Sequence, residues 1–216
     1  MVLKGLKINV LGDSITDGCG TSATEKRFTD LIAARTGAVV RNYGIGGTRI
    51  ARQKEPSANP LFDLCYIDRA LEMDRDADVV MVFGGTNDFG HGDAAFGEFL
   101  SDDEYTFMGA MNVLIKNLIT AYPSAEIVIM TPIHRSNELS TSNDFGRPVR
   151  PLPEYVEAER KYAEYYGIPV LDLWSVSGIQ PAEPILMERY APDGLHPNDL
   201  GHERLAKKII SFIEAL

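Results

Sequence analysis

Five short apolar segments recur along the chain at wide intervals, and they constrain its fold more than any other feature. They are rich in Val, Ile and Leu, which is typical of strands buried on both faces, and they occupy residues 8–11, 38–43, 78–84, 126–131 and 168–173. Segments with one apolar face, typical of helices, follow them at 23–36, 62–73, 105–122, 153–167 and 198–216. This alternation predicts an α/β fold in which helices cover both faces of a parallel sheet, a three-layer α/β/α sandwich.

The length of the chain suits one domain with a large core. Its 216 residues contain no internal repeat, low-complexity tract or linker, so we expect a single domain over residues 1–216. Lys and Arg total 21 and Asp and Glu total 31, which gives a formal net charge of −10. That charge argues against nucleic acid and anionic membrane surfaces as partners. A small molecule is the expected partner, and the oligomeric state is left open.

The amino-terminal segment predicts where the chain resides. Lys4 and Lys7 interrupt the apolar run that a signal peptide needs, and no stretch approaches the roughly 18 apolar residues of a membrane-spanning helix. We therefore expect a cytoplasmic protein, unless a leader precedes this sequence. The two cysteines, Cys19 and Cys65, are too few for a disulfide-rich secreted fold, so we expect free thiols.

The segments that follow the predicted strands are polar and rich in glycine. They read GDSITDG, GIGGTR, GGTNDFG, TPIHRS and, after a longer connection, APDGLHPN. Parallel α/β sheets bind ligands at the carboxyl ends of their strands, so we expect these segments to meet on one rim. Two connections, 85–104 and 132–153, are long, and long loops in compact domains often carry function.

Ser14 and His196 are the candidate nucleophile and general base on this rim. Ser14 follows the first strand and precedes a helical turn, so a helix N-cap is the alternative interpretation. His196 lies three residues after Asp193, and a carboxylate at that spacing can hold Nδ1 of the imidazole and leave Nε2 as a base. Serine needs such a base, because its hydroxyl is a poor nucleophile at neutral pH. The alternative for DGLHP is a plain turn before a helix that starts near Pro197.

Acyl transfer also needs hydrogen-bond donors for the developing oxyanion. Three groups are candidates: the N–H of Ser14, the N–H of Gly47 and the side-chain amide of Asn87. Gly47 permits a close approach because it has no Cβ. Ordinary turns are the alternative interpretation of the GIGG and TND segments, which contain Gly47 and Asn87. A dinucleotide fingerprint is absent, because Arg49 stands where the third glycine of that motif belongs.

Four of these segments resemble the signature blocks of the SGNH, or GDSL, hydrolases. GDSIT, NYGIGG, GGTND and DGLHP occur in the family's order between residues 12 and 197. The resemblance implies a flavodoxin-like five-stranded sheet in the order 2-1-3-4-5 and esterase chemistry without a metal or other cofactor. It also implies a triad and an oxyanion hole: Ser14 as nucleophile, His196 as general base, Asp193 as its orienting partner, and the N–H of Ser14, the N–H of Gly47 and the amide of Asn87 as donors.

Other side chains on the rim have two interpretations each. Asp13 is expected to be structural and to accept hydrogen bonds from nearby backbone N–H groups, because a sequence neighbour of Ser14 is badly placed to orient His196. Further candidates for substrate contact are Asp13, Thr86, His134 and Arg135. In the connection 85–104, internal packing is favoured over a substrate wall for Phe89, Phe96 and Phe99. In the connection 132–153, pairing with carboxylates is favoured over substrate binding for Arg135, Arg147 and Arg150.

The sequence therefore predicts a serine ester hydrolase that cleaves a short acyl ester, with an O-acetyl group on a carbohydrate-like alcohol as the first choice. Two alternatives remain open. A metal-dependent phosphoesterase would use the carboxylates of the rim, namely Asp13, Asp17, Asp88 and Asp193. A non-catalytic binding module on the same fold would have no need of the complete set of Ser14, Asn87, Asp193 and His196.

Overall fold

The computed structural model describes residues 2–216 and is built around a five-stranded parallel sheet. Its strand order is β2-β1-β3-β4-β5, the order that the family resemblance implied, and every neighbouring pair is parallel. The strands are β1 (Lys7–Gly12), β2 (Val39–Gly44), β3 (Val79–Phe83), β4 (Glu126–Met130) and β5 (Val170–Leu171). All five predicted strands are present. β5 is shorter than the predicted 168–173, because Pro169 has no N–H to donate and Asp172 already begins the next helix.

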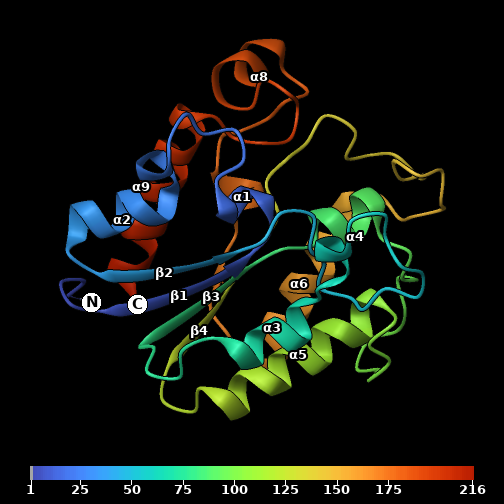
Figure 1. The fold of residues 1–216 in the computed structure, drawn as a ribbon, viewed down its shortest axis with the longest axis horizontal. Coiled ribbons are helices and arrows are strands. Elements are labelled where there is room, and N and C mark those ends of the chain that lie inside the picture. Colours follow the sequence, from blue (N-terminus) through green and yellow to red (C-terminus); the bar gives the residue numbers. More distant parts are fainter. Residues whose placement is uncertain (1) are drawn as a thin grey trace.

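Helices cover both faces of the sheet, which confirms the predicted three-layer sandwich (Figure 1). On one face α2 (Phe28–Thr36) packs against α9 (Asp199–Ala215), and the other face carries α3 (Tyr66–Glu72), α5 (Phe107–Ala121) and α6 (Leu152–Tyr166). Each face has its own apolar core. In β1, Ile8 and Val10 enter the core on the α2 and α9 side, whereas Leu11 enters the other, because successive side chains of a strand point to opposite faces.

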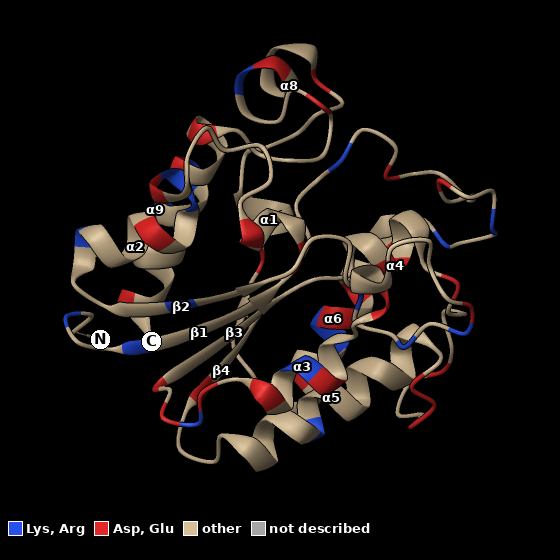
Figure 2. Ribbon diagram, in the orientation of Figure 1, with Lys and Arg blue, Asp and Glu red and all other residues tan. Residues whose placement is uncertain are grey.

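Charged residues are concentrated in the helices and loops, as the colours in Figure 2 show. The three interior strands carry charge only at their first residues, Lys7 in β1 and Glu126 in β4, and β3 carries none. This distribution explains why these strands read as continuous apolar runs in the sequence.

Two of the predicted helices are interrupted near their starts. In the segment 23–36, η1 (Thr24–Lys26) ends at an extended Arg27, and α2 begins at the next residue. The backbone N–H of Phe28 donates to Nδ1 of the buried His202, 3.1 Å away. A tertiary contact from α9 therefore sets the start of α2, and local periodicity carries no sign of it.

The second interrupted helix is the predicted 62–73. There η2 (Pro60–Asp63) is followed by two extended residues before α3 begins. The second of them, Cys65, forms an isolated parallel bridge with Arg49. Pairing with a distant segment thus replaces the first turn of the expected helix.

Four further helices are short: α1 (Ser14–Asp17), α4 (Thr86–His91), α7 (Leu173–Val176) and α8 (Pro184–Tyr190). Only the first of them was predicted, as a helical turn after the first strand. Helices of four to seven residues span too few turns to show the periodicity on which sequence reasoning depends. Two of them, α1 and α4, directly follow strands at the rim where the candidate residues lie.

Both cysteines are free thiols, as predicted, with Cys19 exposed and Cys65 buried. Among residues 2–216, no helix combines the length and the apolar character needed to cross a bilayer. The longest helix of this described part, α9, is amphipathic, and its apolar face packs into the core.

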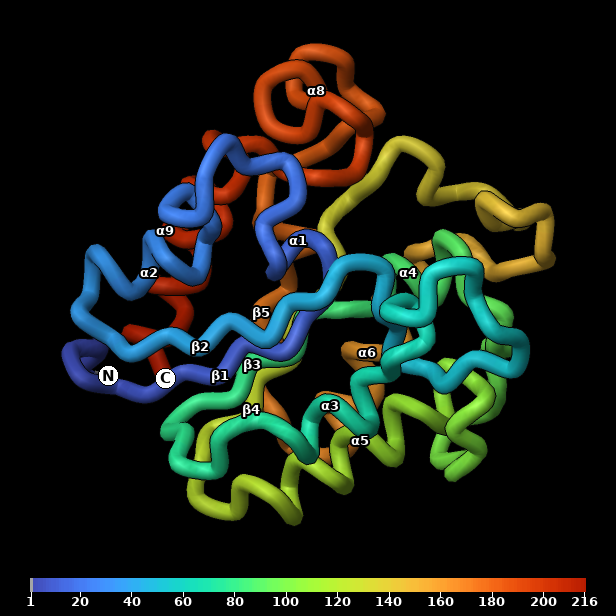
Figure 3. Tube along the Cα trace, viewed as in Figure 1, coloured from blue at the N-terminus to red at the C-terminus, as the bar shows by residue number. Residues whose placement is uncertain are grey.

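The register of the central strands brings three connections together at one end of the sheet. Gly12 at the end of β1 is paired with Gly44 of β2 and with Phe83 of β3. The chain therefore leaves all three strands at the same level, into α1, into the segment after β2 and into α4 (Figure 3).

A close approach between α1 and the end of β2 depends on Gly44. A Cβ on Gly44 would lie 2.2 Å from the backbone nitrogen of Asp17, and Gly46 has no comparable conflict because its nearest atom, Cβ of Ser14, would lie 3.7 Å away. Only a residue without a side chain lets the helix that starts at Ser14 rest on β2.

We expect Gly44→Ala to lower the free energy of unfolding by about 2 kcal/mol, because α1 must move to relieve the overlap. The matched control Gly46→Ala should cost less than about 0.5 kcal/mol. Urea denaturation followed by circular dichroism measures both values. Equal stabilities for the two variants would contradict the proposed contact between α1 and β2.

Candidate active site

Ser14 is the first residue of α1, directly after β1. Asp13, and not Ser14, is the N-cap of this helix: its side chain accepts the N–H of Ile15 at 2.9 Å. The interpretation of Ser14 as an N-cap is therefore wrong, and the expectation that Asp13 binds a nearby backbone N–H is confirmed. The Ser14 hydroxyl is available for another partner, and its Oγ lies 3.0 Å from Nε2 of His196.

His196 is fixed by Asp193 through the turn that both share. Oδ2 of Asp193 lies 2.7 Å from Nδ1 of the imidazole. Oδ1 accepts the backbone N–H groups of Leu195 and His196 at 2.9 and 2.7 Å. Partial burial raises the pKa of Asp193, but the hydrogen bonds from the imidazole and the two N–H groups outweigh it, so the pKa lies below its usual value. Asp193 is therefore ionised at neutral pH, and a negative carboxylate holds the Nδ1 side of the ring.

The turn after β2 and the first turn of α4 meet beside Ser14. Gly47 has a φ of +77°, a conformation that glycine adopts without strain, and Cβ of Ser14 lies 3.7 Å from the Cβ position of Gly46. Asn87 is buried in α4 and donates one side-chain N–H to the carbonyl oxygen of Thr48 at 3.0 Å. Since an amide nitrogen carries two hydrogens, this bond orients Asn87 and leaves the second hydrogen for another acceptor.

Two carboxylates of the rim are buried and occupied by the backbone. Asp88 accepts the N–H groups of Ile50 and Ala51 at 3.0 and 2.9 Å, and Asp13 accepts that of Ile15. Burial raises the pKa of each carboxyl group to about 6. Within residues 2–216 no three His, Cys, Asp or Glu side chains form a group that could hold a metal ion. The arrangement therefore gives no support to the phosphoesterase alternative.

Thr86 and His134 lie at the same end of the sheet, in different surroundings. Thr86 is buried at the start of α4. His134 is half-buried, with its ring centroid 3.8 Å from that of Trp174 and its Nδ1 2.9 Å from Glu138. Substrate contact by either side chain stays a prediction.

The side chain of Arg135 packs against α4. It is only 6% exposed, its Nη1 donates to the carbonyl oxygen of Thr86 at 3.2 Å, and its guanidinium lies 5.2 Å from the ring centroid of Phe89. Its Nη2 also lies 3.6 Å from Asp144. These contacts support the turn that carries Asn87.

The aromatic side chains of the 85–104 connection pack internally, as favoured. Phe89 is fully buried, Phe96 contacts Tyr155 at 5.1 Å between ring centroids, and Phe99 contacts Tyr162 at 4.8 Å. The favoured pairing of arginines with carboxylates is confirmed for Arg135, and also for Arg150, which binds Glu154 at 2.9 Å. Arg147 is exposed and lies 5.9 Å from the ring of Phe145.

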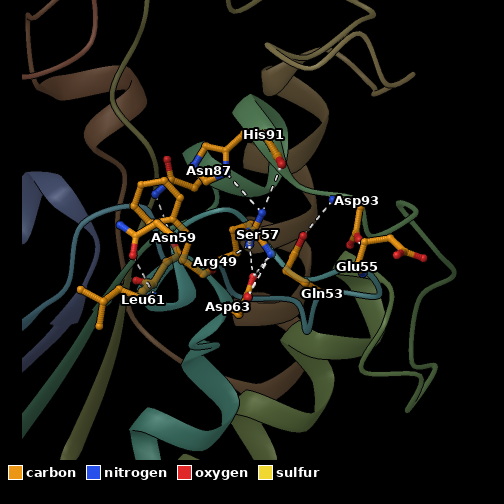
Figure 4. Close-up of polar contacts among 12 residues, drawn as sticks. Arg49, Gln53, Glu55, Ser57, Asn59, Leu61, Asp63, Asn87, His91 and Asp93 are labelled. Atoms are coloured by element: carbon orange, nitrogen blue, oxygen red, sulfur yellow. Dashed lines mark hydrogen bonds and ion pairs between the residues drawn. The ribbon is translucent and has the colours of Figure 1, made fainter.

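A cavity beside the turn after β2 contains residues that the sequence analysis did not assign to the site. We name it the aromatic pocket and define it by Arg49, Ala58, Phe62, His91 and Phe145, which all line it. Figure 4 shows Arg49 and His91 facing each other, with Asn87 on the same helix as His91. The four-residue spacing of Asn87 and His91 was visible in the sequence, but it gains meaning only once α4 is known to be a helix.

Known proteins resemble this chain over nearly its whole length. The family model described as "GDSL-like Lipase/Acylhydrolase family" matches residues 10–204. A solved structure from Lactobacillus plantarum is 30% identical, with a TM-score of 0.81 and 98% coverage of both chains. The lipase/acylhydrolase from Enterococcus faecalis is 22% identical, with a TM-score of 0.67, 97% coverage of this chain and 96% of that one. A search of curated proteins finds no match.

We expect Arg135→Met to lower the free energy of unfolding by about 2 kcal/mol, because the buried Thr86 carbonyl loses a charged donor. Arg147→Met, which changes an exposed arginine, should cost less than about 0.5 kcal/mol. Chemical denaturation of both variants measures the difference. A loss at Arg135 no larger than that at Arg147 would rule out the supporting role.

Proposed function

The chain belongs to the GDSL-like lipase/acylhydrolase family, and from this premise we propose that it is a serine ester hydrolase. One observation carries the proposal: the hydrogen-bonded series from Ser14 Oγ to His196 Nε2 and from His196 Nδ1 to Asp193 Oδ2, at 3.0 and 2.7 Å. A serine hydroxyl, an imidazole and a carboxylate in this order form a nucleophile, its base and the group that orients the base.

In the proposed cycle, Nε2 of His196 takes the hydroxyl proton of Ser14 while Oγ bonds to the ester carbonyl carbon. The tetrahedral intermediate then loses the alcohol oxygen, which receives that proton from His196. Water attacks the acyl-serine by the same route: His196 takes its proton, its oxygen bonds to the acyl carbon, and Ser14 recovers a proton as the acid leaves. Asp193 stays ionised and stabilises the imidazolium that forms in each half of the cycle.

The developing oxyanion is proposed to sit among the N–H of Ser14, the N–H of Gly47 and the side-chain amide of Asn87. The N–H of Ser14 has no partner within α1, because the first N–H groups of any helix lack one. Asn87 is oriented by its bond to Thr48, so the donor is in place before the reaction and costs no reorganisation during it.

The substrate is proposed to be a small ester with a short acyl group, with an O-acetyl group on a carbohydrate-like alcohol as the first candidate. The alcohol must lie on the His196 side, since His196 protonates it. That side is open and polar: the side chain of Asp193 is 55% exposed, and Asp17 and Cys19 are also exposed. Such surroundings suit a hydrated alcohol. A panel of acetylated sugars and simple alkyl acetates tests this choice.

We expect Ser14→Ala to abolish ester hydrolysis and to prevent covalent labelling by a fluorophosphonate, because both need the Oγ nucleophile. Hydrolysis of 4-nitrophenyl acetate and intact-protein mass spectrometry measure the two effects. Full activity in Ser14→Ala would exclude the assignment. If the unaltered protein neither hydrolysed esters nor reacted with the probe, the binding-module alternative would replace it.

We expect Asn87→Ala to raise the activation barrier by roughly 3 kcal/mol, a loss of about a hundredfold in kcat, because one oxyanion donor is removed. The control is Asn117→Ala in α5, beside Leu71 and Arg75, which should retain full activity. Steady-state kinetics on one acetate ester compares the variants. A higher KM with an unchanged kcat would show that Asn87 binds the substrate without stabilising the oxyanion.

A further inference from the structure

We infer that the aromatic pocket receives the acyl group of the ester and is shaped for a flat ring the size of a benzoyl group. This inference rests on the proposed function, since it places a substrate that reacts at Ser14. It extends the expected acyl range from acetyl to a single ring and sets an upper limit to that range.

The aromatic pocket adjoins the proposed oxyanion hole at two points. The ring of Phe62 covers Gly47 so closely that a Cβ there would lie 2.1 Å from Cδ1 of that ring. His91 stands four residues after Asn87 in α4, so the two side chains lie on one face of the helix, one turn apart. A group attached to a carbonyl carbon beside Gly47 and Asn87 has this pocket as its neighbour.

The pocket lies on the acyl side of the proposed reaction. His196 must reach the alcohol oxygen, so the alcohol extends towards His196 and the acyl group away from it. In Figure 1 the connection that leads into α9 lies on one side of α1, whereas the segment after β2 and α4 lie on the other. His196 belongs to the first side, where its Cβ lies 3.3 Å from the Cβ position of Gly20.

The walls of the pocket are flat. The ring centroids of Phe62 and His91 are 5.6 Å apart, and those of His91 and Phe145 are 6.3 Å apart. Burial lowers the pKa of His91 to about 4, so this ring is neutral at neutral pH and suits an apolar neighbour. Flat aromatic groups gain more from such walls than area burial alone provides.

Arg49 holds these walls in place. Its side chain is 2% exposed, Nη2 donates to the carbonyl oxygen of Phe62 at 2.7 Å and to Oγ of Ser57 at 3.1 Å, and Nη1 donates to the carbonyl oxygen of His91 at 3.2 Å (Figure 4). One buried guanidinium thus ties the segment after β2 to α4. A pocket fixed in this way binds without ordering its own loops, which lowers the cost of binding.

Two polar side chains of the pocket lining have partners within the protein, whereas Glu55 and Arg147 of the same lining are exposed and charged. Gln53 donates to the carbonyl oxygen of Ala51 and accepts the N–H of Asp93, and Oδ1 of Asn59 accepts the N–H of Leu61. The atoms that Gln53 and Asn59 use in these bonds are not available to a ligand hydroxyl, and leaving such a hydroxyl unpaired is costly. The aromatic walls formed by Phe62, His91 and Phe145 favour a flat ring in this pocket.

The volume of the pocket, about 280 Å³, limits the size of the group. Pockets that hold whole drug-sized ligands span about 300–1,000 Å³. One ring fits this space, and a long alkyl chain extends beyond it. The inference therefore includes discrimination against long fatty acyl groups.

The first experiment varies only the acyl group. It uses 4-nitrophenyl acetate, hexanoate, benzoate and dodecanoate, with each kcat/KM divided by the rate constant for hydrolysis by hydroxide. We expect the normalised value for benzoate to exceed that for acetate at least tenfold, and that for dodecanoate to lie below hexanoate. A benzoate value at or below the acetate value overturns the inference, while hydrolysis of acetate alone leaves the proposed function standing.

The second experiment changes the pocket. Ala58→Trp places an indole in the space from an exposed position, and Phe145→Ala removes a wall residue that is 67% exposed, so neither disturbs the core. We expect the benzoate-to-acetate ratio of kcat/KM to fall at least tenfold in Ala58→Trp and at least threefold in Phe145→Ala. The control Ala34→Trp, at an exposed position in α2, should keep the ratio of the unaltered protein.

The outcomes separate the two levels of inference. An unchanged ratio in both pocket variants overturns the assignment of the aromatic pocket, whatever the absolute rates. Activity on both esters that persists in Ser14→Ala overturns the proposed function itself. A ratio that falls only in the pocket variants supports the acyl assignment.

Discussion

The parallel register of β1 with its two neighbours is the constraint on which the candidate site depends. Gly12 is paired with both Gly44 and Phe83, so the segments that carry Ser14, Gly47 and Asn87 leave the sheet at one level. A slip of two residues along β1 would keep its side chains facing the same cores but move Ser14 by roughly 6.6 Å along the strand. Hydrogen-bond distances tolerate no such shift. The packing of the strands therefore fixes the geometry of the reacting groups.

The sequence predicted the sheet well because strands buried on both faces must be apolar throughout, and that requirement is visible in a single chain. It also predicted the Asp193–His196 pair, since four consecutive residues of one tight turn hold both groups. It offered Ser14 as the possible cap of α1, whereas the cap is Asp13. Both residue types are good N-caps, and the choice depends on which oxygen faces the N–H of Ile15.

The aromatic pocket shows the limit of sequence reasoning. Arg49 and His91 are 42 residues apart, and neither belongs to a periodic segment that would place it. Chemically equal side chains also diverge through tertiary packing. His202 is buried against Phe28 at 5.8 Å between ring centroids and supports α2, whereas His196 faces a carboxylate and a hydroxyl. Residue type alone identifies the candidate residues. The role of each one depends on its position in the fold.

The two sides of Ser14 are built in different ways. Towards the pocket, buried groups hold the backbone: Asp88 binds the N–H groups of Ile50 and Ala51, and Arg49 binds the carbonyl groups of Phe62 and His91. Breaking a buried charged hydrogen bond is costly, so this side is rigid. Towards His196 the ordering group is the half-exposed Asp193, in contact with solvent. A rigid wall selects its ligand by shape, whereas an open, hydrated edge accepts many. Selectivity in this molecule should therefore reside in the acyl group more than in the alcohol.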